Sequence, residues 1–263
     1  AEGESVRKVI DQYASLARSA EQQGTMTVSG KEGWLFFGPE LRFVSAGPFW
    51  GPAANKVSKA TKPEFADPLP AIIDFHRQLK KMGVELLMVP VPPKSVVYPD
   101  FLSDRLAISP DNPPVRIDTE TQAFYQLLRK EGIRVLDLTS FFLANRFPRE
   151  GAPFCKQDTH WSGNGCVLAA RKIREEIEGR PWLKTMPKST YQSAWKSLPI
   201  AGDLWKALGE KGLPQEILSV RQVGTGSAGA LKSIAPDQKS PVILVGDSHN
   251  LVFHAGDDMQ TRD

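Results

Sequence analysis

The 263-residue chain has few of the residues that mark several functional classes. It contains only two cysteines and four histidines, and its formal net charge is +3. No CxxC or Cys/His spacing of the kind that holds structural zinc is present. No lysine or arginine run exceeds two residues, so the basic patch that nucleic acids require is missing. A zinc module and a nucleic-acid partner are therefore not expected, whereas the slight cationic excess suits approach to an anionic polymer.

Long apolar runs are also missing. No stretch of 18 or more apolar residues occurs, so no transmembrane helix is predicted for this chain, and no signal peptide is visible. The apolar content of 41% and charged content of 24% are ordinary for a folded globular protein. We expect one domain that spans residues 1–263.

Helical periodicity alternates with short apolar strands. We expect helices over residues 4–24, 67–83, 115–132 and 162–180, and strands over 84–92, 133–139 and 241–245, the last of which runs into a turn. A hairpin is expected over 25–44, and residues 190–212 favour a loop followed by a helix. The pattern predicts an α/β fold with a mainly parallel sheet flanked by helices. Functional sites of such sheets lie beyond the carboxyl ends of the strands.

The stretch QDTHWSGNG, residues 157–165, places a carboxylate two residues before one of the four histidines. Asp158 can orient the ring of His160 and stabilise the imidazolium, which makes His160 a candidate general base. Ser162 is the expected N-cap of the following helix. A purely structural Asp–His hydrogen bond near a helix start is the alternative interpretation.

The stretch PVILVGDSHN, residues 241–250, supplies the candidate nucleophile. A buried strand would deliver Ser248 to the sheet edge, where a base within hydrogen-bond reach could activate it. Gly, Asp and Ser also favour ordinary turns. Considered together, Asp158, His160 and Ser248 make a complete catalytic triad, and triads occur in several chain orders.

These motifs resemble those of a known family. GDS after a strand is similar to the first block of SGNH hydrolases, but here it follows the Asp-x-His block. That inverted, permuted order resembles the alginate O-acetyltransferase family, the SGNH-like J and X type proteins of bacterial exopolysaccharide acetylation. Three further stretches resemble segments of the family. The early hairpin resembles GWLFFGPELR, and the turn with Lys and Tyr-Pro resembles VPVPPKSVVYP. The Asp-x-His-Trp segment and its helix resemble DTHWSGNGCVLAARKI.

The resemblance implies acetyl transfer to a periplasmic polysaccharide through Ser248, His160 and Asp158, with an acetyl-enzyme intermediate and no cofactor or metal. It also implies a membrane partner that delivers the acetyl donor. The residues that complete the oxyanion hole are expected beyond residue 263, so we expect the domain to be incomplete at its C-terminus. An acetylesterase with the same triad and a non-catalytic polysaccharide-binding protein are the alternatives.

Four further residues are candidates for substrate contact. Lys94 and Tyr98 follow a predicted strand end and suit a sugar carboxylate, whereas Trp161 and His249 adjoin the triad residues. The alternative for Lys94 and Tyr98 is a structural turn, and the alternative for Trp161 is packing beneath the histidine.

Two remaining features allow more than one interpretation. Cys155 and Cys166 flank the histidine motif and are either free thiols or a disulfide, which an oxidising compartment would permit. GTGSAG, residues 224–229, matches a dinucleotide fingerprint, but no crossover helix follows it, so a glycine-rich loop is favoured.

Overall fold

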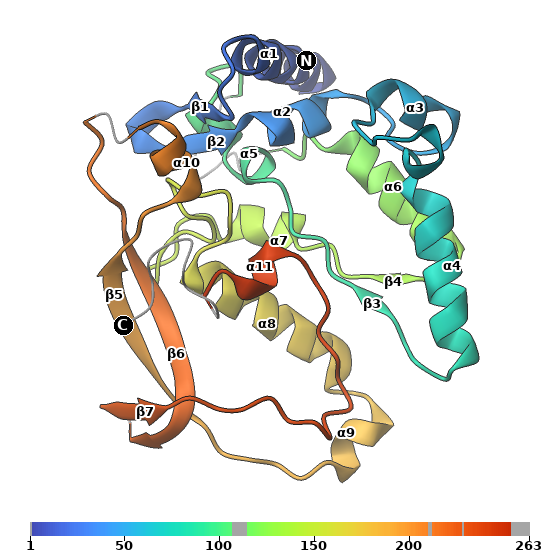
Figure 1. Ribbon diagram of the computed structural model, residues 1–263, viewed down its shortest axis with the longest axis vertical. Helices are drawn as coiled ribbons and strands as arrows, with labels where there is room; N and C mark the ends of the chain where they lie inside the picture. Colours follow the sequence, from blue (N-terminus) through green and yellow to red (C-terminus); the bar gives the residue numbers. More distant parts are fainter. Residues whose placement is uncertain (1, 107–114, 210–211, 228, 254–263) are drawn as a thin grey trace. The chain divides into compact units, whose positions relative to one another are not determined.

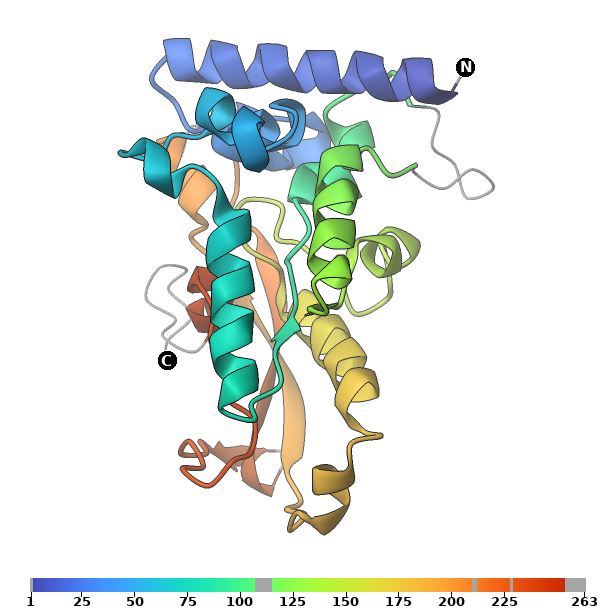
Figure 2. The ribbon, with the colours of Figure 1, turned by 90° about the vertical axis from the view of Figure 1, so that its right-hand side faces the viewer.

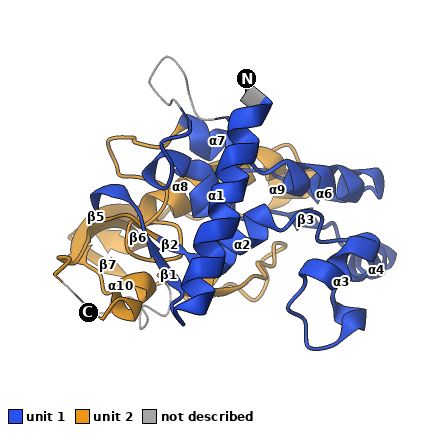
Figure 3. Cartoon of the chain, turned by 90° about the horizontal axis from the view of Figure 1, so that it is seen from above, with its two compact units in different colours: residues 1–32, 36–144 blue, residues 33–35, 145–263 orange. Residues whose placement is uncertain are grey.

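The structure is a computed structural model that describes residues 2–106, 115–209, 212–227 and 229–253. The chain divides into two compact units, shown in Figure 3. Unit 1 comprises residues 1–32 and 36–144, and unit 2 comprises residues 33–35 and 145–263. The expectation of one domain over residues 1–263 stays a prediction.

Unit 1 is mainly helical. Its helices are α1 (Glu2–Gln22), α2 (Gly38–Ser45), α3 (Ala54–Val57), α4 (Pro68–Lys81), α5 (Lys94–Val97), α6 (Thr119–Lys130) and α7 (Thr139–Ala144). Its strands are β1 (Thr27–Ser29), β2 (Leu35–Phe37, the first residue of which is counted with unit 2), β3 (Leu87–Met88) and β4 (Arg134–Val135). Turns of 3-10 helix cover residues 31–33, the last of which is also counted with unit 2, 51–53, 63–65 and 99–101.

Helix α1 lies along α2 and buries its apolar stripe there (Figure 1). Val9 and Tyr13 of α1 and Leu41 of α2 are all buried. The Tyr13 hydroxyl keeps a partner in this core, since it donates a 2.7 Å hydrogen bond to the carbonyl of Ser95. The predicted amphipathic helix is therefore confirmed, and burial of its stripe supplies the stability that helical propensity alone does not.

A second core in unit 1 surrounds the parallel pair β3–β4, whose register sets Leu87 opposite Arg134. The buried side chains Phe124, Tyr125 and Leu128 of α6 lie at its centre. Residues of α4 pack against the same cluster, and Figure 2 shows α4 and α6 on either side of β3. The predicted helix–strand alternation is confirmed here.

Unit 2 contains helices α8 (Gly163–Ile177), α9 (Pro181–Thr185), α10 (Asp203–Ala207) and α11 (Ser248–Leu251) and strands β5 (Gln192–Pro199), β6 (Ile217–Ser227) and β7 (Ala230–Lys232). The three strands form an antiparallel sheet in the order β5-β6-β7 (Figure 1). Helix α8 packs against β6.

Three local predictions differ from the structure. Residues 192–199 form strand β5 rather than a loop, because they pair over their whole length with β6, whose paired residues lie 18 to 32 positions further along the chain. The predicted hairpin keeps β1 and β2, but residues 38–45 form helix α2. The GTGSAG glycines begin within β6, where a Cβ on Gly224 would meet the carbonyl oxygen of Lys232 at 2.4 Å.

The predicted strand before Ser248 also differs. Residues 241–247 form neither helix nor strand and join no sheet among the described residues. Ile243, Leu244 and Val245 are 83%, 73% and 82% exposed rather than buried. The pairing that would bury this apolar run is absent from the described part of the chain, so the parallel sheet there is limited to β3 and β4. The α/β class stands, with smaller sheets than expected.

Within the described ranges, no helix combines the length and the apolarity needed to cross a bilayer.

Two glycines let α8 start close against its surroundings. A Cβ on Gly163 would meet the carbonyl oxygen of Ser219 at 2.4 Å, and one on Gly165 would meet that of Pro153 at 2.1 Å. Both obstacles are backbone atoms, which cannot move aside as the end of a side chain can. The start of α8 is thereby held against the preceding loop and against β6.

We predict that Gly165→Ala destabilises the protein by about 1–3 kcal/mol, the usual cost of overpacking a close contact. Gly179→Ala is the matched control, because nothing lies within 4 Å of its Cβ position. Thermal and urea unfolding of both variants would measure the difference. Equal stability of the two variants would contradict the close packing of Gly165.

Candidate active site

A closed loop before α8 presents the histidine of the DTH motif. Phe154 and Trp161 form an isolated antiparallel bridge, and the amide of Cys155 donates to the carbonyl of His160 at 3.2 Å. Ser162 caps α8, since its Oγ accepts from the amide of Gly165 at 3.0 Å. The predicted N-cap is confirmed. The bridge and the cap together fix both ends of the short segment 155–161.

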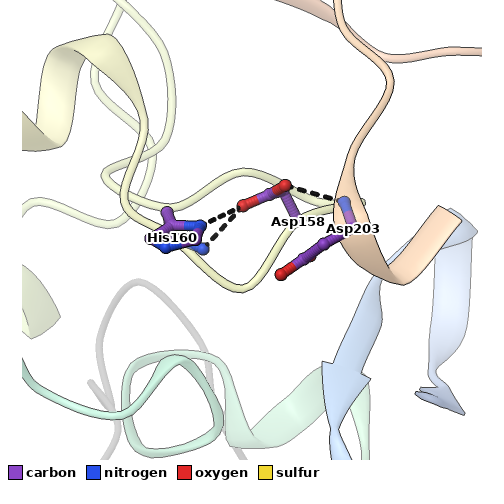
Figure 4. A group of neighbouring side chains, drawn as sticks. All are labelled: Asp158, His160 and Asp203. Carbon is purple, nitrogen blue, oxygen red and sulfur yellow. Dashed lines mark hydrogen bonds and ion pairs between the residues drawn. The ribbon is translucent and has the colours of Figure 1, made fainter. Parts of the chain in front are cut away.

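Asp158 and His160 make two hydrogen bonds within this loop (Figure 4). Asp158 Oδ1 lies 2.7 Å from His160 Nδ1 and accepts from the amide of His160 at 2.9 Å. Both residues are buried. The predicted contact between carboxylate and imidazole is confirmed, and it favours the tautomer with the proton on Nδ1.

Ser248 approaches the other nitrogen of the same ring. Its Oγ lies 2.7 Å from His160 Nε2, so the predicted serine–histidine geometry is confirmed. Ser248 is the first residue of α11, and Asp247 caps that helix by accepting from the amide of His249 at 3.0 Å. Ser248 is exposed, whereas the histidine it contacts is buried. An accessible hydroxyl is thus connected to a shielded base.

The pKa values of His160 and Asp158 are shifted in opposite directions. Burial alone would lower the pKa of His160, but the hydrogen bond and charge of Asp158, aided by Asp203 and Asp247, raise it above its ordinary value. Burial alone would raise the pKa of Asp158, but its hydrogen bonds from His160 and the Asp203 amide lower it. Asp158 therefore stays ionised while His160 gains proton affinity.

Asp203 is a member of the site that the sequence analysis did not identify. It opens α10, and its amide donates to Asp158 Oδ2 at 2.8 Å (Figure 4). Its carboxylate accepts from the amide of Thr159 at 2.8 Å and from the Thr159 hydroxyl. The only sequence signal is the first-turn position of an acid after Gly202, which many helices share.

Trp161 and His249 pack beside the catalytic candidates. The His249 ring lies 4.7 Å from that of His160 and 5.6 Å from that of Trp161, measured between centroids. Trp161 Nε1 donates to the carbonyl of His249 at 2.9 Å, so the indole pins the start of α11. Burial and the neighbouring His160 charge lower the pKa of His249. Packing thus accounts for Trp161, and the predicted sugar contacts of both residues stay predictions.

Lys94 and Tyr98 belong to unit 1, where both are buried. The Lys94 ammonium lies 5.4 Å from the ring centre of Phe36, and the Lys94 amide donates to Glu40. Buried positions of this kind fit the structural interpretation of the two residues. Their contact with a sugar carboxylate stays a prediction.

The family of the chain follows from comparison with known proteins. A family model described as "SGNH hydrolase-like domain, acetyltransferase AlgX" matches residues 27–254. The chain belongs to this family. The suspected resemblance to the alginate O-acetyltransferase family is confirmed.

Curated relatives of this AlgX-type chain agree with the assignment. It is 28% identical over 178 residues to a "probable alginate O-acetylase AlgJ" of Pseudomonas syringae pv. tomato, covering 67% of this chain and 40% of that protein. It is 24% identical over 237 residues to the protein of the same description from Pseudomonas putida, covering 86% and 55%. The chain thus spans about half the length of these relatives, or less.

Two solved structures share the fold. The O-acetyltransferase domain of Pseudomonas putida AlgJ superposes with a TM-score of 0.56 at 21% identity, covering 76% of this chain and 65% of that one. Pseudomonas aeruginosa AlgX gives a TM-score of 0.51 at 19% identity, covering 76% and 44%. These similarities confirm the SGNH hydrolase-like fold.

Three side chains of the site are also of the types that bind metal ions, namely Asp158, His160 and Asp203. One potential ligand atom from each lies within 4.8 Å of the others. In the AlgX-type chain, however, both oxygens of each carboxylate already accept N–H or O–H donors. A metal ion would need the same oxygen lone pairs that these donors use. The arrangement therefore favours a hydrogen-bonded network over a metal site.

The asparagines near the triad have other partners. Asn164 Nδ2 donates to the carbonyl of Gly151 at 2.7 Å, which ties α8 to the preceding loop. The Asn250 side chain folds over Gly246, where its Nδ2 lies 2.0 Å from the position of an added Cβ. A side chain at position 246 would therefore have to displace that of Asn250, and the expected oxyanion residues beyond residue 263 stay a prediction.

The two cysteines are free thiols in the structure, so the disulfide interpretation is not favoured. Cys155 is buried and its thiol donates to the carbonyl of Trp161 at 3.5 Å. Burial raises the pKa of Cys166 to about 12. A thiol with so high a pKa is a poor nucleophile at neutral pH.

We predict that His160 titrates above 6.5 and His249 below it, because Asp158 stabilises the His160 imidazolium and burial disfavours the charge on His249. Nuclear magnetic resonance titration of the imidazole signals, assigned with His160→Gln and His249→Gln, would measure both pKa values. Asp158→Asn should lower the pKa of His160. A His160 pKa at or below 6.5 in the unaltered protein would contradict this electrostatic arrangement.

We also predict two reactive thiols per chain when the protein is denatured without reductant, and little alkylation of either thiol in the folded state. Burial of Cys155 and the raised pKa of Cys166 are the physical reasons. Mass spectrometry after iodoacetamide treatment would count them. Protein from an oxidising compartment that shows no thiol under denaturing conditions would instead contain the disulfide.

Proposed function

We propose that this chain is the catalytic domain of a polysaccharide O-acetyltransferase that uses Ser248, His160 and Asp158 as its triad. One observation carries the proposal: a single imidazole is hydrogen-bonded to a buried carboxylate and to an exposed hydroxyl, each at 2.7 Å. Serine hydroxyls are weak nucleophiles until a base takes the proton. Membership of the acetyltransferase family supports the choice of an acetyl group as the cargo.

The first half-reaction forms an acetyl-enzyme. Ser248 Oγ attacks the carbonyl carbon of an acetyl ester or thioester, and His160 Nε2 takes the hydroxyl proton. As the tetrahedral intermediate collapses, His160 returns that proton to the departing alcohol or thiol of the donor. Asp158 remains ionised throughout and stabilises the imidazolium, in keeping with its lowered pKa.

The second half-reaction uses the same proton transfers, with a sugar hydroxyl as the nucleophile and Ser248 as the leaving group. A sugar hydroxyl gives its proton to His160 and attacks the acetyl carbonyl. The Ser248 ester bond breaks, and His160 returns the proton to Ser248 Oγ. The products are the acetylated sugar and the free enzyme. Water in place of the sugar would give acetate, which is the chemistry of an acetylesterase with the same triad.

The acceptor that we propose is an exopolysaccharide, with alginate as the model substrate. The curated relatives are described as probable alginate O-acetylases. Trp161 and His249 lie beside His160 and are the candidates for contacts with the sugar there. We further propose an extracytoplasmic, periplasmic site of action and a membrane partner that delivers the acetyl group.

We predict that Ser248→Ala lowers the turnover of an activated acetyl ester by about 10³-fold or more, because no other group replaces the nucleophile. Ser189→Ala, a change at an exposed serine before β5, is the matched control and should retain full activity. Initial rates with p-nitrophenyl acetate and intact mass after donor addition would measure turnover and the acetyl-enzyme. Near wild-type turnover by Ser248→Ala would exclude Ser248 as the nucleophile.

Product analysis separates the candidate functions in the same experiment. Acetylated mannuronate oligomers formed from donor and acceptor support transfer, whereas acetate alone supports an esterase. Binding of the oligomers without any acetyl-enzyme, and with affinity unchanged by Ser248→Ala, would support a non-catalytic polysaccharide-binding protein.

A further inference from the structure

Asp203 and the segment Asp158–Thr159 exchange hydrogen bonds in both directions. The Asp203 amide donates to Asp158 Oδ2 at 2.8 Å. In return, Asp203 Oδ1 accepts from the amide of Thr159 at 2.8 Å, and Oδ2 accepts from the Thr159 hydroxyl. Residues 45 positions apart are thereby locked together on the side of Asp158 that faces away from His160.

Close backbone contacts of the residues next to Asp158 and Asp203 extend the same connection. The amide of Trp205 donates to the carbonyl of Gln157 at 3.1 Å. A Cβ on Gly202 would meet that carbonyl oxygen at 2.2 Å and the Asp158 Cβ at 3.0 Å. Only a glycine allows α10 to start this close to the DTH loop, so the approach of Asp203 is determined by the fold.

A helix cap alone does not account for Asp203. Its Oδ1 accepts from the adjacent amide of Leu204 at 2.7 Å, as a first-turn acid can. However, α10 has only five residues, and both carboxylate oxygens also accept from Thr159. The larger share of its hydrogen bonds goes to the residue between Asp158 and His160.

We propose that Asp203 is a positioning residue for the triad, which holds Asp158 and, through the Thr159 backbone, His160 in the geometry that activates Ser248. The inference rests on the proposed function, since it assigns a role within the same site. Outer hydrogen-bond partners of this kind fix the orientation of the residues that do the chemistry, and their loss costs about 10- to 100-fold in comparable sites.

The charge of Asp203 acts on the same groups. The charged or titratable side chains that face His160 are Asp158, Asp203, Asp247 and His249, and the three carboxylates raise the pKa of His160. Burial and the nearby charge of Asp158 raise the pKa of Asp203 itself. As the pH falls, Asp203 therefore takes up a proton before Asp158 does and loses acceptor capacity toward Thr159.

Two substitutions separate geometry from charge. Asp203→Asn keeps an oxygen acceptor and the side-chain shape but removes the charge, so kcat should fall by no more than about threefold while the His160 pKa decreases. Asp203→Ala removes both, so kcat should fall by about tenfold or more with KM nearly unchanged. Asp237→Asn, at an exposed aspartate that accepts from the Lys239 amide at 2.9 Å, is the matched control and should change neither value.

The measurements are kcat and KM with an activated acetyl ester, the His160 pKa by nuclear magnetic resonance, and the melting temperature of each variant. Wild-type kcat and an unchanged His160 pKa in Asp203→Ala would overturn the inference. If Asp203→Ala does not fold, Thr159→Val tests the same connection, because it removes the hydroxyl that donates to Asp203 Oδ2 and that also lies 3.3 Å from His160 Nδ1. It should lower kcat several-fold, and its effect should be less than additive with that of Asp203→Asn. Fully additive losses would overturn the inference.

The experiment also distinguishes failure of the inference from failure of the proposed function. If the unaltered protein transfers no acetyl group but Asp203→Ala lowers the His160 pKa further than Asp203→Asn does, Asp203 positions the histidine beyond the effect of its charge and the proposed chemistry is wrong. If the unaltered protein is active and Asp203→Ala matches it, the chemistry stands and the positioning role is wrong.

Discussion

The imidazole of His160 is the group on which the arrangement of unit 2 depends, because both of its nitrogens are hydrogen-bonded. Nδ1 faces Asp158 and Nε2 faces Ser248, each at 2.7 Å. Hydrogen bonds of this length tolerate displacements of only a few tenths of an ångström. The ring therefore relates two segments 88 residues apart in the sequence. The bridge between Phe154 and Trp161 and the cap at Ser162 serve to hold it in place.

Because Asp158 is buried, departures from this arrangement cost free energy. An ionised carboxylate that leaves water without compensation costs several kcal/mol. Asp158 is 1% exposed, and it accepts from the amide and the ring of His160 and from the amide of Asp203. Removing any of these donors would leave part of that cost uncompensated. Conformations of the loop that misplace His160 are disfavoured for the same reason, so folding and the catalytic geometry depend on the same hydrogen bonds.

Local interactions were predictable from the sequence, whereas distant ones were not. Asp158, His160 and Ser162 lie within five positions, so their spacing alone indicates the contact and the cap. Asp203 lies 45 residues from its partner, in a stretch without strong periodicity, and one acid after a glycine is too common to indicate a role. Strand β5 was missed because its stability comes from pairing with β6 rather than from its own alternation. The expected strand over 241–245 fails for the converse reason, since an apolar run alone does not provide a pairing partner.

The two histidines of the site differ from each other in proton affinity, and so do the two aspartates. In the mechanism that we propose, these differences favour one path for the proton. The His160 and His249 rings lie 4.7 Å apart, with the pKa raised for His160 and lowered for His249. Asp158 and Asp203 face one another similarly, with the pKa lowered for Asp158 and raised for Asp203. Like charges this close disfavour one another, so His160 binds a proton more readily than His249, and Asp158 loses its proton more readily than Asp203. Asp158 and His160, whose pKa shifts favour their charged forms, are the members in line with Ser248. In the mechanism that we propose, a proton that leaves Ser248 therefore stays on His160 for the leaving group rather than passing to the second histidine or the second aspartate.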